Sequence, residues 1–275
     1  MAEAKKNSNL AVRLATAAVA VPLLLLLLYR GPAWGLYCLI LPASLIGTYE
    51  LLSMTHHGDR VSQGIGLAIA AGSSAALYFY GHDVRVVLTV LAIVPVAGPL
   101  LTLIRLGDVH TSAMRATTMS MAPLFVSAPL AWLAVVRRDV PDGASYVVMT
   151  LMFAWFSDTG GYFAGRFLGK HKLYPAVSPK KTVEGAIGGL AGSVIGGLLA
   201  HFWYLPRIPL AHVVPLALIA GALGQAGDLG ESLLKRATGV KDSGAIVPGH
   251  GGILDRIDAL ILTSTVVYLY TLWIA

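Results

Sequence analysis

The sequence predicts an all-α integral membrane protein with about nine transmembrane helices. Two properties of the composition indicate this class. Of the 275 residues, 56% are hydrophobic and only 12% are charged, whereas soluble domains carry about 25% charged residues. The mean hydropathy is +0.72. Cys38 is the single cysteine and lies in an apolar run, so we expect neither a disulfide within the chain nor a cysteine-ligated zinc site.

The apolar residues fall into segments of about 20 residues, the length that a hydrocarbon core of about 30 Å requires. We expect the first segment to be kept as a helix rather than cleaved as a signal peptide, because no small-x-small cleavage site follows Leu28. No linker divides the chain, so residues 1–275 are predicted to form one membrane domain. The predicted segments are 12–29, 33–54, 64–81, 85–104, 118–136, 143–165, 183–204, 211–234 and 252–274.

The positions of Lys and Arg predict the orientation of these segments. With the N-terminus in the cytoplasm, most of the 20 Lys and Arg residues fall in cytoplasmic segments, and the C-terminus lies outside. Both of the most basic loops, 166–181 and 235–251, then face the cytoplasm from the cell's inner (plasma) membrane. The net charge of +6 sits in short loops between apolar segments, so nucleic-acid binding is not expected.

The stretch 225–258 is the most polar part of this apolar chain and holds the main candidate site. Asp228, Ser232 and Lys235 recur at i, i+4 and i+7 and so share one face of a helix. Asp255 and Asp258, three positions apart, are likewise adjacent on a second helix, and a basic, glycine-rich turn joins the two. Carboxylates beside Lys, Arg and exposed backbone suit a divalent cation that holds phosphates. The alternative is a set of buried ion pairs that keeps two helices in register. The candidate residues are Asp228, Ser232, Lys235, Arg236, Lys241, His250, Asp255, Arg256 and Asp258.

Two further carboxylates fall within predicted spans. Asp158 lies well inside its segment, where a charge must face a partner or a wet cavity. It is expected either to belong to the site or to form a structural ion pair with a neighbouring helix. Glu50 lies near the end of the second segment, where it either sits at the membrane interface or serves a function. The sequence leaves both choices open.

The basic loop before the seventh segment is a candidate phosphate site. Either Ser178 or Thr182 can cap the next helix, with Pro179 early in its first turn. A helix N-terminus that carries Lys180 and Lys181 favours phosphate binding. The alternative is an ordinary positive-inside loop that also contacts anionic lipid headgroups.

Small residues recur at every fourth position of the seventh segment and form two ridges. Such ridges let helices approach closely. We therefore expect a packing role, either inside the fold or at the face of a homodimer. The ridges are Gly188, Gly192 and Gly196, and Gly185, Gly189, Ser193 and Gly197.

Several of these residues together resemble the signature of the phosphatidate cytidylyltransferases, also called CDP-diacylglycerol synthases. Residues 178–185 resemble a second motif of this family, and residues 157–160 fit the segment before it. One position departs from the pattern, because Val247 stands where a larger Leu, Ile or Phe is usual. The resemblance covers residues 150–275, the predicted catalytic half, whereas residues 1–140 match only in their spans and are expected to be mainly scaffold. The signature residues are Ser232, Lys235, Arg236, Lys241, Asp242 and the run 248–258.

The resemblance implies that phosphatidate and CTP give CDP-diacylglycerol and pyrophosphate in a reaction that requires Mg²⁺, with a second cation left open. The lipid phosphate attacks the α-phosphorus of CTP, so Ser232 is expected to contact metal or phosphate rather than act as a nucleophile. His250 is either a general acid or a structural residue of the turn. The implied metal ligands are Asp228 and Asp255, with Asp158 or Asp258 nearby. The implied phosphate-binding residues are Ser178, Lys180, Lys181, Thr182, Lys235, Arg236, Lys241 and Arg256, the last alternatively pairing with a carboxylate.

Three other functions are weighed against this reaction. A secondary transporter or ion channel would also have many spans and buried carboxylates, but it predicts symmetry between the two halves, and the charged residues cluster in the second. A phosphotransferase that consumes CDP-lipids would pair an Asp-Gly start with repeated aspartates four apart, a pattern the sequence lacks. Synthesis of another CDP-activated lipid stays open, because the headgroup chemistry is shared and only the tails differ.

Overall fold

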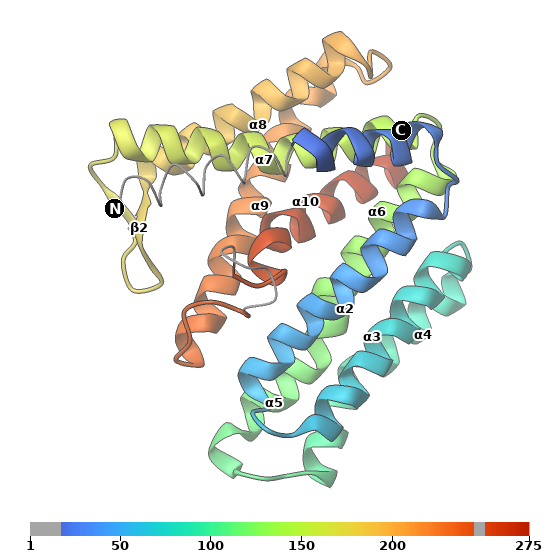
Figure 1. Cartoon of the computed structure of the whole chain (residues 1–275), viewed down its shortest axis with the longest axis vertical. Coiled ribbons are helices and arrows are strands. Elements are labelled where there is room, and N and C mark those ends of the chain that lie inside the picture. Colours follow the sequence, from blue (N-terminus) through green and yellow to red (C-terminus); the bar gives the residue numbers. More distant parts are fainter. Residues whose placement is uncertain (1–17, 245–250, 275) are drawn as a thin grey trace.

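The computed structural model describes residues 18–244 and 251–274 (Figure 1). Nearly all of these residues lie in helices, which confirms the main part of the all-α prediction. Within these described residues, five helical segments are long and apolar enough to cross a membrane, so the chain is a membrane protein, whereas the total of nine spans stays a prediction. The five segments are Gly35–Thr55, Val84–Ile104, Val109–Asp139, Val183–Trp203 and Leu210–Ala237.

The first half of the chain forms a group of long helices (Figure 1). Aspartate side chains begin three of them: Asp59 accepts from the Ser62 amide, and Asp83 and Asp108 cap the next two helices in the same way. Such caps satisfy amides that have no partner within the helix. The segments are the helix over Ala18–Arg30, α2 (Gly35–Thr55), α3 (Arg60–Tyr80), α4 (Val84–Ile104), α5 (Val109–Ala122), the π-helical turn η1 (Pro123–Ser127) and α6 (Ala128–Asp139).

The second half contains longer helices and one hairpin. Figure 1 shows α8 crossing α7, while α9 and α10 lie side by side and α10 packs against α6 and α2 of the first half. The hairpin projects from the end of α7 on the side where α9 also ends. The segments are α7 (Gly143–Phe167), β1 (Lys172–Tyr174), β2 (Ser178–Thr182), α8 (Val183–Trp203), α9 (Leu210–Ala237) and α10 (Leu254–Trp273).

The hairpin corrects the prediction for the basic loop. Its antiparallel strands place Lys172 opposite Thr182 and Tyr174 opposite Ser178. Pro179 therefore lies in β2, and its predicted place in the first turn of a helix was wrong. Of the two predicted caps, Thr182 is the one used, because its Oγ1 accepts from the Gly185 amide at 3.1 Å. Residues 178–181 pair with a preceding strand, so the helix begins only at residue 183.

The largest buried cluster contains residues from both halves of the chain. Leu52 of α2 and Leu130 of α6 share it with Val147 of α7 and Ile261 of α10. Burial of such side chains is the dominant favourable term in folding. The helix that carries two of the candidate aspartates, α10, is therefore seated directly on the predicted scaffold. The single-domain organisation stays a prediction.

The glycine ridges of α8 pack inside the chain. A Cβ atom on Gly192 would overlap the carbonyl oxygen of Phe156 in α7, and one on Gly188 would overlap Ala164 in the same helix. On the other ridge, a Cβ atom on Gly197 would press against Phe153 of α7 and against α9. The two helices approach closely because these positions carry no side chain. The predicted packing role is confirmed, in its form inside the fold.

Candidate active site

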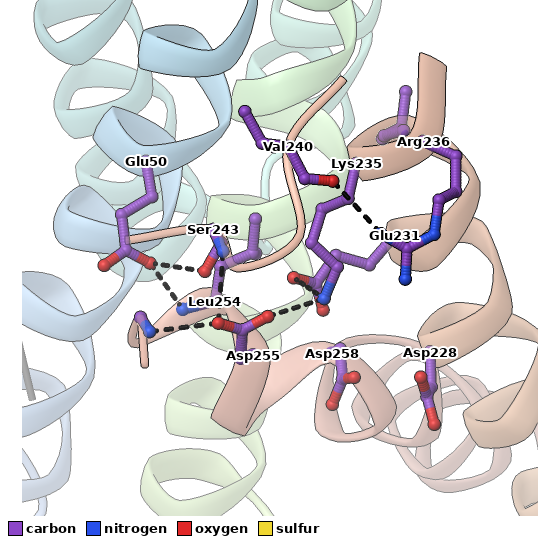
Figure 2. A network of polar contacts seen from close by, with 12 residues as sticks. Glu50, Asp228, Glu231, Lys235, Arg236, Val240, Ser243, Leu254, Asp255 and Asp258 are labelled. Atoms are coloured by element: carbon purple, nitrogen blue, oxygen red, sulfur yellow. Dashed lines mark hydrogen bonds and ion pairs between the residues drawn. The ribbon is translucent and has the colours of Figure 1, made fainter. Parts of the chain in front are cut away.

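Two lysine–aspartate pairs mark the candidate site. Nζ of Lys181, on β2, lies 2.5 Å from Oδ2 of Asp228 on α9. Nζ of Lys235, also on α9, lies 2.6 Å from Oδ1 of Asp255 on α10 and 3.2 Å from Oε1 of Glu231. Figure 2 shows the second pair. Each of the two aspartates predicted first as metal ligands is thus paired with a lysine.

A cavity of about 380 Å³ lies between α7, the hairpin, α8 and α9. Asp158 of α7 lines it and lies within electrostatic range of Asp228 and Lys181. The Asp158 carboxylate therefore faces charged groups, as expected of a charge in a predicted span. The polar residues around the cavity are Asp158, Arg166, Lys180, Lys181, Gln225 and Asp228.

Asp258 and Glu231 add carboxylates between the two ion pairs. Asp258, on α10, lies within electrostatic range of Asp228 and Asp158, and Figure 2 shows it beside Asp228. Glu231 is only 2% exposed. Lys235 approaches its Oε1 without hydrogen-bond geometry, so among the described residues neither oxygen has a hydrogen-bond partner. Through its ion pair with Lys235, this buried carboxylate belongs to the same charged cluster as Asp255.

Asp255 is held by protein groups on both of its oxygens. Its Oδ1 meets Lys235, and its Oδ2 accepts from the amides of Ser243 at 3.2 Å and Gly252 at 3.0 Å. Gly251 precedes this turn at a φ of 81°, a left-handed conformation that suits glycine. A Cβ atom at Gly251 would also lie 2.9 Å from Oδ2 of the aspartate. The turn therefore fixes the orientation of the Asp255 carboxylate.

Arg236 binds backbone in the structure. Its Nε donates to the carbonyl of Val177 at 3.3 Å, and its Nη1 donates to that of Val240 at 3.2 Å. The guanidinium thus ties the hairpin to the turn that follows α9. The proposed phosphate contact of Arg236 stays a prediction and would require its side chain to leave these carbonyls.

The remaining predicted residues lie around this centre. Ser232 is half-buried on α9, and Lys241 is exposed on the following turn. Arg256 is exposed on α10 and lies within electrostatic range of Asp158. His250 and Val247 lie outside the described residues.

The carboxylate oxygens at the site fit a hard cation whose remaining coordination positions are filled by water and substrate phosphates. Over residues 18–244 and 251–274, no group of three or more His, Cys, Asp or Glu is arranged as a metal site. Mg²⁺ does not require one, because it commonly keeps several waters and binds one or two carboxylates plus substrate phosphates. Asp228, with Asp158 and Asp258 close by, supplies carboxylate oxygens of this kind.

Two residues of the site were not assigned a role from sequence. Glu231 lies three positions after Asp228 and four before Lys235, so helical spacing placed it on their side of α9. Gln225 lines the cavity and donates through Nε2 to the Ala186 carbonyl at 3.1 Å. Its position three residues before Asp228 was the only signal in the sequence.

The fold and the site together define a helical membrane protein whose carboxylates and lysines meet at a cavity suited to phosphate groups. Residues 11–274 match the sequence model described as the cytidylyltransferase family. The chain therefore belongs to the cytidylyltransferase family.

Individual relatives match over part of their length. A protein from Brucella suis biovar 1, named phosphatidate cytidylyltransferase, is 46% identical over 139 residues, which are 50% of this chain and 51% of the relative. Proteins of the same name from Staphylococcus saprophyticus subsp. saprophyticus and Staphylococcus aureus (strain COL) are 48% and 47% identical over 118 residues, 43% of this chain and 45% of each relative. The chain thus spans about half the length of the curated relatives it matches.

Proposed function

We propose that this protein transfers CMP from CTP to phosphatidate, giving CDP-diacylglycerol and pyrophosphate for phospholipid biosynthesis. The observation that carries the proposal is the Lys181–Asp228 pair in a cavity that also holds Asp158. A lysine and two carboxylates at one cavity suit polyphosphate and cation chemistry. The family match and the printed name of the relatives support the nucleotide and the lipid.

The proposed reaction is a direct displacement at phosphorus. An oxygen of the lipid phosphate forms a bond to the α-phosphorus of CTP, and the bond from that phosphorus to the bridging oxygen breaks as pyrophosphate leaves. Such a displacement needs alignment and charge neutralisation rather than a protein nucleophile. Lys180 and Lys181 neutralise phosphate oxygens at the cavity, and Ser232, Lys241 and Arg256 offer further contacts.

The proposal assigns Mg²⁺ to the carboxylates around the cavity. Asp228 is the central ligand, with Asp158 and Asp258 beside it. Asp255 was also predicted as a ligand, but protein groups already hold both of its oxygens. We therefore assign Asp255 to orienting Lys235. Bound Mg²⁺ would supply neutralisation of phosphate charge.

The proposed topology has nine spans, a cytoplasmic N-terminus and an external C-terminus in the inner membrane. The contact between Arg236 and Val177 supports one part of it, because it places the basic hairpin against the end of α9. Both basic segments then meet CTP on the cytoplasmic side. The proposal includes no homodimer, because the glycine ridges that suggested one pack against α7 and α9 within the chain.

The experiment is pyrophosphate release by detergent-purified protein, given phosphatidate, Mg²⁺ and one nucleotide at a time. We expect release with CTP that requires both the lipid and Mg²⁺. Release with a different phospholipid acceptor, and none with phosphatidate, would favour synthesis of another CDP-activated lipid. No release with any nucleotide from folded protein would contradict the proposal and return attention to an ion pathway.

A further inference from the structure

Glu50 belongs to the half of the chain that the sequence assigned to scaffold, yet its carboxylate lies at the start of α10 (Figure 2). The residue is 2% exposed, so its carboxylate is buried inside the protein and needs hydrogen-bond donors there. Its Oε2 accepts from the Leu254 amide at 2.8 Å and from Oγ of Ser243 at 3.2 Å. Its Oε1 accepts from the Ile253 amide at 3.1 Å. Three donors of the candidate active site thus converge on one side chain of α2.

These hydrogen bonds supply a cap that α10 lacks in its own sequence. Ile253 precedes the helix and has no side chain that can cap it. The first amides of a helix have no partner within it and need acceptors from elsewhere. A carboxylate at that end is also favoured by the helix dipole. Glu50 therefore caps α10 from another helix, about 200 residues earlier in the chain.

Two glycines make room for the Glu50 carboxylate. A Cβ atom on Gly244 would overlap its Oε1, and one on Gly252 would overlap its Oε2. Neither Gly244 nor Gly252 is among the described glycines that have a positive φ angle. Their lack of a side chain thus serves the close approach of Glu50 rather than a left-handed turn. The polypeptide on both sides of residues 245–250 closes around this one carboxylate.

Ser243 connects Glu50 to the charged pair of the site. Its hydroxyl donates to Glu50 and its amide donates to Oδ2 of Asp255. Oδ1 of Asp255 in turn accepts a hydrogen bond from Nζ of Lys235 at 2.6 Å. The first turn of α10, which Glu50 caps, also carries Asp255 and leads to Asp258. A displacement of that turn would move these groups relative to Asp228 on α9.

We propose that Glu50 is a positioning residue of the active site: by capping the first turn of α10, its carboxylate sets the placement of Asp255 and Lys235. The predicted scaffold thereby fixes part of the catalytic geometry. The catalytic consequence rests on the proposed cytidylyl transfer, whereas the structural consequence for α10 does not.

The test uses Glu50→Gln, which keeps the volume but replaces one acceptor oxygen by an NH₂ group that faces a donor. Gly244→Ala is a second variant that displaces the carboxylate without altering it. The matched control is Thr48→Val, half a turn away on α2, which removes a buried hydrogen bond to Ser127 of 3.2 Å that does not involve α10. Thermal unfolding in detergent first confirms that each protein is folded.

Two measurements separate positioning from general support of the fold. We expect Glu50→Gln and Gly244→Ala to lower kcat about tenfold, the scale of a lost helix cap, with the KM for phosphatidate within about twofold of wild type. Hydrogen exchange of a peptide covering residues 251–256 should become about tenfold faster. Thr48→Val should change neither quantity more than about twofold, even where it lowers the unfolding temperature.

Three outcomes would contradict the assignment of Glu50 as a positioning residue. Unchanged kcat and unchanged exchange in folded Glu50→Gln would overturn it, and so would equal effects from Thr48→Val. Failure of both test variants to fold would also overturn it, because Glu50 would then support the fold as a whole. If wild-type protein releases no pyrophosphate, the proposed function fails, while the exchange of residues 251–256 still decides whether Glu50 fixes α10.

Discussion

Nζ of Lys181 and Oδ2 of Asp228 lie 2.5 Å apart and join β2 to α9 across 47 positions of sequence. Their side chains are 28% and 31% exposed, at the wall of a cavity. Ion pairs with this much solvent contact contribute about 0–1 kcal/mol to stability. A place at the cavity wall and a small stabilising effect both support the proposed role of the pair in binding substrate phosphate or metal.

The first prediction concerns this lysine. Lys181→Met should lower kcat/KM for CTP about 10- to 100-fold, because it removes a charged hydrogen-bond donor from the cavity. Lys172→Met, on the exposed strand β1 of the same hairpin, should stay within about twofold of wild type. Equal losses in the two variants would show that the hairpin acts only through its overall charge.

The second prediction separates the two lysine-paired aspartates. Asp228→Asn should raise the Mg²⁺ concentration for half-maximal rate about tenfold or more, since it removes a proposed metal ligand. Asp255→Asn should abolish most turnover with little change in that concentration, because Asp255 contacts Lys235 and backbone amides. Binding of Mn²⁺ to each variant, followed by electron paramagnetic resonance, gives a readout without turnover. A weaker Mn²⁺ site in Asp255→Asn alone would reverse the assignment.

The third prediction tests the contact between α7 and α8. Gly192→Ala should destabilise the protein by about 1–3 kcal/mol, because its Cβ atom would overlap the Phe156 carbonyl. Gly72→Ala, in α3, is the matched control, since no atom lies within 4 Å of its Cβ position. It should be neutral or stabilise by about 0.4–1 kcal/mol. Thermal unfolding by circular dichroism compares them, and equal midpoints would contradict the close packing.

The fourth prediction is a pH dependence at the N-terminus of α3. Hydrogen bonds from the Ser62 side chain, followed by Arg105, hold the pKa of Asp59 well below its usual value. A depressed folded-state pKa stabilises the protein above the unfolded-state pKa, and that stabilisation is lost as the pH falls below it. Asp59→Asn should therefore cost about 1 kcal/mol at pH 7, with the difference shrinking from about pH 5 to pH 3. A difference that stays constant over this range would contradict the ion-pair account.

The helices of the described residues could be predicted from the sequence, because long apolar runs have few alternatives in a membrane protein. The hairpin could not, because the turn at residues 175–177 is rich in neither glycine nor asparagine. The Pro-Lys-Lys run after Ser178 is as compatible with the first turn of a helix as with a strand. Strand pairing with Lys172 and Tyr174 decided the structure, and that pairing has no local signal.

The sequence predicted most residues of the candidate site, but only part of how these residues contact one another. Helical spacing brought Asp228, Glu231 and Lys235 to one helix, but it could not show that Asp228 pairs with Lys181 of the hairpin. The partner of Glu50 was likewise hidden, because its contacts with α10 come entirely from tertiary packing. Arg236 shows the converse, since a residue expected at phosphate donates to two backbone carbonyls.

The most direct test of the proposed reaction follows the label from CTP into lipid. Purified protein in phosphatidate-containing vesicles with Mg²⁺ is given CTP labelled either at the α-phosphorus or at the γ-phosphorus. Attack at the α-phosphorus predicts that the α-label enters the lipid fraction as CDP-diacylglycerol, while the γ-label appears only in pyrophosphate. Label from the γ-position in lipid, or from neither position, would contradict the account.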